Sequence, residues 1–145
     1  MMVVVMDPED YQSILMEIAD FSEIDTSTIA STRKSLMELT ERREQLLEIQ
    51  KRIKRDIRGA ERYYLDRMAE IRSEVENLKE NSSRFKRIIT GNPAAAQAKA
   101  MKQLQRNRDT LIETYRELLE YTGELLEYTE DLMIELYDSI KSFFG

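Results

Sequence analysis

The 145-residue sequence has no cysteine, histidine or tryptophan, and only 4 glycines and 2 prolines. Without cysteine the chain has no disulfide, thiolate nucleophile, zinc ribbon or iron–sulfur ligand. Without histidine it lacks the commonest general base and the Glu-x-x-His motif of di-iron bundles. It also has no glycine-rich phosphate loop or dinucleotide-binding motif. We therefore predict no enzyme activity and no cofactor. Carboxylates could still hold Mg²⁺, although on helices they usually form a solvated surface.

Long apolar runs are missing as well. No segment approaches the ~20 apolar residues that a membrane span requires. The apolar stretch 1–6 lacks the basic start of a signal peptide and is too short for one. It is a short strand, a frayed end, or a stretch that precedes a true start at Met6. We expect a cytoplasmic protein with no membrane-spanning segment.

The residues that are present favour long amphipathic helices, since 34% are charged and 41% hydrophobic. We predict an all-α protein with a single helical domain over residues 1–145. Asp7 suits the N-cap and Pro8 the first position of a helix at about 8–22. Helical spacing places one set of apolar residues on a single face of this helix: Tyr11, Ile14, Leu15, Ile18 and Phe21.

A second helix is predicted at about 26–89, with cap candidates in Asp25, Thr26 and Ser27. Its apolar residues recur mostly every three or four positions. Steps of four cluster at Ala60, Tyr64 and Met68. Such a stutter locally relaxes left-handed supercoiling.

The clearest break in the chain is the turn at 90–93. Gly91 can adopt the left-handed conformation after a helix, Asn92 can cap the next helix, and Pro93 can begin it. A third helix is predicted at about 93–143. A link this short returns the chain antiparallel, so the two long helices form a coiled-coil-like hairpin.

A tight turn also predicts the register of the hairpin. If Ile89 lies opposite Pro93, basic residues of the second helix face acidic residues of the third. Each exposed pair contributes only ~0.2–1 kcal/mol, but together such pairs favour one register over others. The predicted pairs are Arg52–Glu130, Arg55–Glu127, Arg58–Glu124, Arg62–Glu120, Glu80–Lys102 and Glu76–Arg106.

The same register places Gly59 level with Gly123, and these are the only interior glycines of the two long helices. Each costs ~1 kcal/mol relative to alanine inside a helix. Two interpretations stay open. The glycines mark a hinge or a close helix crossing, or they occupy solvent-facing positions by coincidence.

The third helix carries a leucine at every seventh position, and a second apolar column runs beside it. Two adjacent columns suit a helix that contacts at least two neighbours. We therefore predict that the hairpin pairs into a homodimeric bundle, although the leucines also suit an ordinary core within one chain. The candidate oligomer seam consists of Leu104, Leu111, Leu118, Leu125 and Leu132.

Charge is distributed unevenly around the net value of −6. Residues 1–32 hold seven acids and no bases, residues 33–110 twenty bases and twelve acids, and residues 111–145 nine acids and two bases. Around the turn, bases occur without acids, and the free amides of a helix start add positive potential. This is a candidate anion-binding region or simply a solvated basic helix end. Its residues are Arg84, Lys86, Arg87, Asn92, Lys99, Lys102, Arg106 and Arg108.

These features favour a non-catalytic helical scaffold or adaptor that binds itself and an unidentified protein partner. The alternative is an anion-binding or nucleic-acid-binding module that uses the basic region 84–108. No zinc-finger or RNA-recognition signature supports base-specific binding.

Overall fold

The structure is a computed structural model that describes residues 6–81 and 93–144. In these residues it contains three α-helices and no strand, so the all-α class is confirmed. The helices are α1 (Pro8–Ile18), α2 (Ile29–Asn81) and α4 (Pro93–Phe143). α4 spans the range predicted for the third helix. The predicted turn before Pro93 lies outside the described residues.

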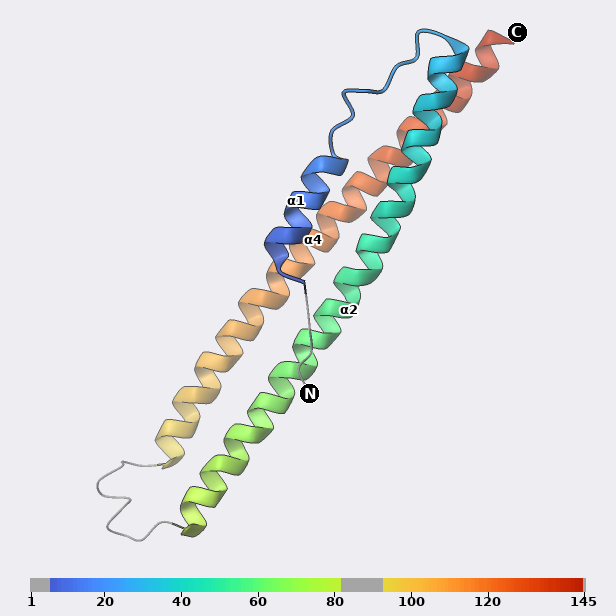
Figure 1. Ribbon diagram of the computed structural model, residues 1–145. Coiled ribbons are helices and arrows are strands. Elements are labelled where there is room, and N and C mark those ends of the chain that lie inside the picture. The colour runs from blue at the N-terminus through green and yellow to red at the C-terminus, as the bar shows by residue number, and fades with distance from the viewer. Residues whose placement is uncertain (1–5, 82–92, 145) are drawn as a thin grey trace. The chain divides into compact units, whose positions relative to one another are not determined.

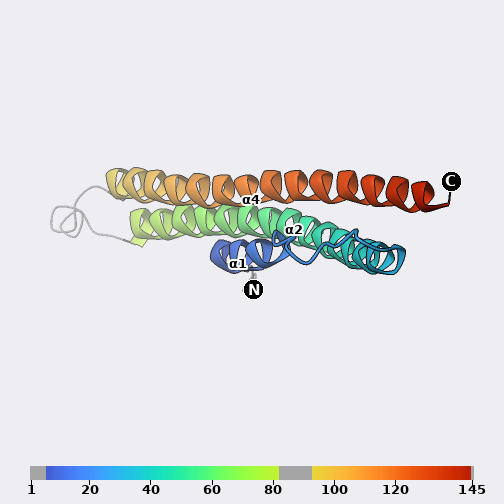
Figure 2. The same ribbon diagram turned by 90° about the horizontal axis from the view of Figure 1, so that it is seen from above.

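Contacts divide the chain into two compact units. We call residues 6–56 and 115–145 the three-helix unit, because they contain α1, the start of α2 and the end of α4. We call residues 57–114 the two-helix unit. Within each unit α2 and α4 lie side by side and antiparallel (Figures 1 and 2), so the predicted packing of a long helix pair is confirmed. The single domain over 1–145 stays a prediction.

α1 begins where the sequence predicts but ends four residues earlier. The side chain of Asp7 accepts a hydrogen bond from the Glu9 N–H at 3.0 Å, and Pro8 occupies the first turn. The helix ends at Ile18 rather than at 22. The reason is local, because the Asp20 carboxylate accepts the Ser22 N–H at 3.0 Å and stabilises a turn in place of the helix. Phe21 therefore lies in the loop after α1.

α2 begins at Ile29 rather than at 26, with Thr28 before its first turn. Thr28 Oγ1 accepts the Ser31 N–H, and Ser31 Oγ accepts the Thr28 N–H, both at 3.0 Å. This reciprocal capping leaves the predicted cap residues in the loop. Asp25 accepts the Ser27 N–H at 2.9 Å instead, which lowers the pKa of Asp25.

The core of the three-helix unit consists of two heptad columns and one face of α1. Each side chain of the two columns is at most 3% exposed. The α2 column is Thr32, Leu39, Leu46 and Ile53, and the α4 column is Tyr115, Thr122, Thr129 and Leu136. From α1, Tyr11, Leu15 and Ile18 are buried against them. A three-helix arrangement thus excludes water from this core.

The two-helix unit has a thinner core. Among the side chains that the structure describes in this unit, the buried apolar ones are Ala60, Ile71 and Val75 on α2 and Ile112 on α4. Most other apolar residues at seam spacing are only half-buried, namely Tyr64, Met68, Met101, Leu104 and Leu111. Two helices cannot enclose a seam from all sides, so these side chains keep contact with solvent.

The predicted register of the hairpin is wrong. Glu130 does not face Arg52; it pairs with Arg43, nine residues earlier, at 3.1 Å. Arg52 instead pairs with Glu48 within α2 at 3.5 Å. The prediction depended on Ile89 lying opposite Pro93, whereas packing of the buried columns decides the register, since exposed pairs contribute little.

Candidate functional site

A buried polar network holds α1 against the two long helices. The Tyr11 phenol donates a hydrogen bond to Oδ2 of Asp56 on α2, and the Met6 N–H donates to the same oxygen at 3.3 Å. On α4, Tyr115 donates to the Met6 carbonyl at 2.6 Å. Burial and the hydrogen bond to Asp56 raise the pKa of Tyr11, so the phenol remains a neutral donor.

The loop after α1 is fixed by an aromatic contact. The ring of Phe21 meets Tyr128 of α4 edge to face, with centroids 4.9 Å apart. The Arg42 guanidinium of α2 lies 5.0 Å from the centroid of Phe21, a cation–π distance. Its Nη1 atom is buried and has no hydrogen-bond partner within the described part of the chain. Phe21 therefore connects the loop to both long helices.

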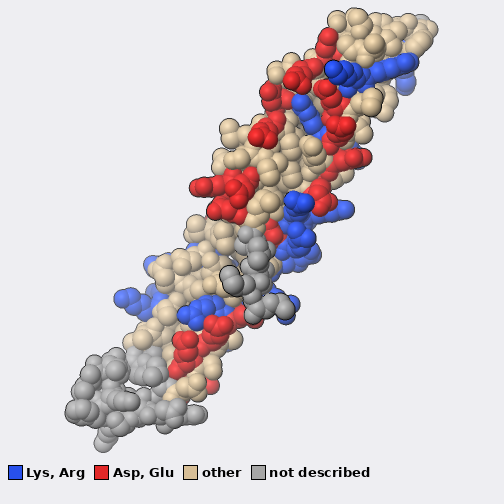
Figure 3. Space-filling model, in the orientation of Figure 1, with Lys and Arg blue, Asp and Glu red and all other residues tan. Residues whose placement is uncertain are grey.

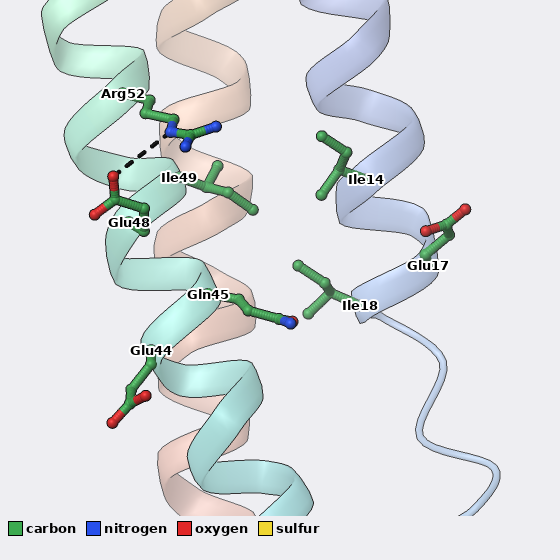
Figure 4. Close-up of a pocket in the computed structure, with 8 residues that line it drawn as sticks. All are labelled: Ile14, Glu17, Ile18, Glu44, Gln45, Glu48, Ile49 and Arg52. Atoms are coloured by element: carbon green, nitrogen blue, oxygen red, sulfur yellow. Dashed lines mark ion pairs between the residues drawn. The ribbon is translucent and has the colours of Figure 1, made fainter.

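An open groove of about 490 Å³ lies between α1 and α2 in the three-helix unit. Figure 4 shows Ile14 and Ile18 of α1 pointing toward Ile49 of α2 across this groove. Ile18 and Ile49 are each 7% exposed, whereas Ile14 is 36% exposed. The groove therefore has an apolar floor that water reaches.

Charged side chains form the edges of the groove. Glu17 of α1 and Glu44 of α2 point away from the floor (Figure 4), and both are exposed. Glu48 and Arg52 pair with each other along α2 at 3.5 Å. Gln45 completes the lining. Three carboxylates and one guanidinium leave the edges net negative.

The groove lies in an acidic part of the molecule. The three-helix unit contains twenty acids and ten bases, whereas the two-helix unit contains eight acids and twelve bases. On the face drawn in Figure 3, carboxylates are spread widely over the three-helix unit. Such an excess of one sign attracts ligands of the opposite charge. The sequence did not reveal the groove, because it forms only where α1 docks beside α2.

The predicted anion-binding residues are only partly described. Arg84, Lys86, Arg87 and Asn92 lie outside the described residues. Lys99, Lys102 and Arg106 are exposed on α4. Arg108 is half-buried and lies 3.7 Å from Glu61 and 3.0 Å from Asp109, so neighbouring carboxylates compensate its charge. A hollow of about 530 Å³ is lined by Lys99 and Lys102 with Ala98, Met101 and Gln105.

The predicted oligomer seam lies beside the buried column of α4. Leu125 is 8% exposed, whereas Leu104, Leu111, Leu118 and Leu132 are half-buried. The leucine spacing did not predict the buried column that includes Thr122 and Thr129, because threonine does not belong to the apolar pattern. These two hydroxyls donate to the carbonyls four residues earlier at 2.7 Å, which makes their complete burial acceptable.

Two further features concern metals and membranes. In residues 6–81 and 93–144, no group of three or more acidic side chains is placed to hold a metal ion. None of the helices in that part of the chain combines the length and apolar character that a membrane crossing needs.

Comparisons of this chain with protein-family models, with curated proteins and with solved structures gave no match.

Proposed function

We propose that this protein is a non-catalytic helical scaffold that acts by binding itself and other proteins. The observation that supports this proposal is the half-buried seam of the two-helix unit. Met68 on α2 and Leu104 on α4 are at seam spacing yet keep contact with solvent. A further helix placed over this seam would remove apolar surface from water at ~25 cal/mol per Å².

The leucine column supports a homodimer as the first such assembly. Leu104 and Leu111 are half-buried seven residues apart in the two-helix unit, and Leu118 and Leu132 are half-buried in the same column of α4. A column of half-buried leucines on one face suits a helix that accepts a further neighbour. Exposed ion pairs contribute little to such an interface. We therefore expect a dimer that survives high salt. A cytoplasmic location belongs to the same proposal.

Sedimentation equilibrium at ~0.1 and ~1 M NaCl tests the homodimer. We expect a dimer at both salt concentrations, and Leu104→Gln is expected to weaken it. Lys102→Gln, an exposed change on the same turn, serves as the matched control and should leave association unchanged. Circular dichroism confirms that each variant stays helical. A folded wild-type monomer at ~100 μM, or dissociation to one at ~1 M NaCl, would contradict the proposal.

The alternative is nucleic-acid or other anion binding by the basic region. The exposure of Lys99, Lys102 and Arg106 on one stretch of α4 favours it, whereas the carboxylate contacts of Arg108 do not. Such binding would weaken steeply with added salt, because counterion release drives it. Lys99→Gln with Lys102→Gln should then reduce affinity for duplex or single strands at ~50 mM salt, while Leu104→Gln should not.

A further inference from the structure

We infer that the groove between α1 and α2 binds an amphipathic helix of another protein that carries lysine or arginine beside an apolar stripe. This inference rests on the proposed function, because it names one class of protein partner. It concerns a surface formed by α1 and α2 of the three-helix unit, whereas the leucine column proposed for the dimer lies on α4.

The floor of the groove supplies the apolar half of this recognition. Ile14 is 36% exposed although it points toward Ile49, so a bound side chain would bury more of it. On α2 the lining extends from Glu44 to Arg52. At ~1.5 Å per residue this stretch is ~12 Å long, or about two helical turns. Two turns present apolar anchors at positions i and i+3 or i+4 of a bound helix.

The edges of the groove supply the charged part of the recognition of a partner helix. Glu17 on α1 and Glu44 on α2 flank the floor from opposite sides, and both carboxylates are exposed to solvent. A bound helix with cationic residues on both sides of an apolar stripe would place a cation near each of them. An acidic helix would meet like charges there, and these repel it.

Arg52 gives the inference a directional test. It is the one cationic side chain among the residues that line the groove, and it partly neutralises Glu48. If a basic helix binds here, Arg52 opposes it, and removing the charge should strengthen binding. A purely structural role for the groove predicts no such gain.

The probe is a fluorescein-labelled peptide of ~14 residues with leucine at i, i+3, i+4 and i+7 and lysine elsewhere. Fluorescence anisotropy with the full chain should show saturable binding. Glu17→Gln with Glu44→Gln is expected to weaken binding ~10-fold, and Arg52→Gln to strengthen it about 2- to 5-fold. The matched control is Glu120→Gln with Glu124→Gln, which removes the same charge from exposed positions of α4 in the same unit and should change little. The same peptide with glutamate in place of lysine should not bind.

Ile14→Ser is a second variant that tests the floor, and because Ile14 is 36% exposed we expect the variant to fold. It should weaken peptide binding without changing the helical signal. Absence of saturable binding, equal weakening by the α4 control, or loss of the dimer in the groove variants would overturn the inference; the last result would assign the groove to a second copy. Sedimentation of the groove variants separates this inference from the proposed homodimer. If the protein still forms a dimer while the peptide does not bind, only the inference about the groove is wrong.

Discussion

Two buried threonines and one buried aspartate of the three-helix unit satisfy their hydrogen bonds in different ways. Thr122 and Thr129 use carbonyls of their own helix, so their burial needs no partner from another element. Asp56 is different, because it is 5% exposed and accepts hydrogen bonds from Tyr11 and from the Met6 N–H. The docking of α1 therefore depends in part on this carboxylate.

Tyr11→Phe tests this dependence. Removing the hydroxyl leaves the Asp56 carboxylate with one fewer donor, so we expect a loss of ~1–3 kcal/mol in unfolding free energy near neutral pH. Because the pKa of Tyr11 is raised in the folded state, its contribution is complete below pH ~10 and is lost as pH rises further. Urea unfolding between pH ~7 and ~11 measures the unfolding free energy of wild type and variant. The difference between these two free energies should decrease by ~1.4 kcal/mol per pH unit above ~10. A difference that stays constant to pH ~11 would show that folding does not shift the titration of this phenol.

Gly123 lies within an uninterrupted α4, and a Cβ atom built there meets nothing within 4 Å. In a single chain this favours a solvent-facing position over a close crossing by another described segment. Gly123→Ala should therefore raise the unfolding free energy by ~1 kcal/mol, measured by urea unfolding. Destabilisation would contradict this expectation. If sedimentation instead shows that Gly123→Ala weakens dimerisation, two copies cross closely at Gly123.

At the scale of elements, short side-chain hydrogen bonds decide where the helices begin and end. Asp20 ends α1 early by accepting the Ser22 N–H, and Thr28 with Ser31 delays the start of α2. In both places several Asp, Ser and Thr residues compete for the same backbone groups. The backbone path of the loop determines which of these side chains forms the hydrogen bond.

Thr28→Ala should destabilise the protein by ~1 kcal/mol, because the N-cap oxygen that accepts the Ser31 N–H is lost. Thr26→Ala is the matched control, since Thr26 is an exposed loop residue with the same side chain. The change at Thr26 should stay within ~0.5 kcal/mol in thermal or urea unfolding. Equal effects of the two changes would place the cap elsewhere in the loop.

At the scale of the whole molecule, the two units differ in core thickness and in charge. The three-helix unit covers its α2 and α4 columns with Tyr11, Leu15 and Ile18, whereas the two-helix unit leaves most of its seam half-buried. The first unit has an excess of acids and the second an excess of bases. The thin core of the second unit supports the proposed dimer, and the charge and groove of the first support a basic partner.

Hydrogen exchange should reveal this difference along a single helix. Amides of α2 between Leu39 and Ile53 are expected to exchange at least ~10-fold more slowly than those between Tyr64 and Val75, since local opening is cheaper where less apolar surface is buried. Mass spectrometry of peptic peptides measures both regions in one experiment. Addition of a partner or an increase in protein concentration should protect the second region. Uniform protection of the dilute chain would contradict the proposed difference between the units.

The all-α class and the positions of the long helices follow from local features of the sequence. Glycine and proline are scarce, and apolar residues recur at helical spacing. Both features are local, and together they favour long helices over other secondary structure. Asp7 and Pro8 similarly mark the start of α1, because capping involves neighbouring residues only. Leu39, Leu46 and Ile53 are apolar residues of α2 at helical spacing, and they belong to its buried column.

The register, the central column of α4 and the groove arise instead from packing between residues that are far apart in the chain. Glu130 pairs with Arg43 rather than with Arg52, because burial of the columns outweighs the small free energy of exposed ion pairs. Thr129 lies in the core although its residue type suggests the surface, since its hydroxyl is satisfied within its own helix. The groove depends on where α1 docks beside α2, and that contact joins residues far apart in the sequence, whose proximity no local pattern records.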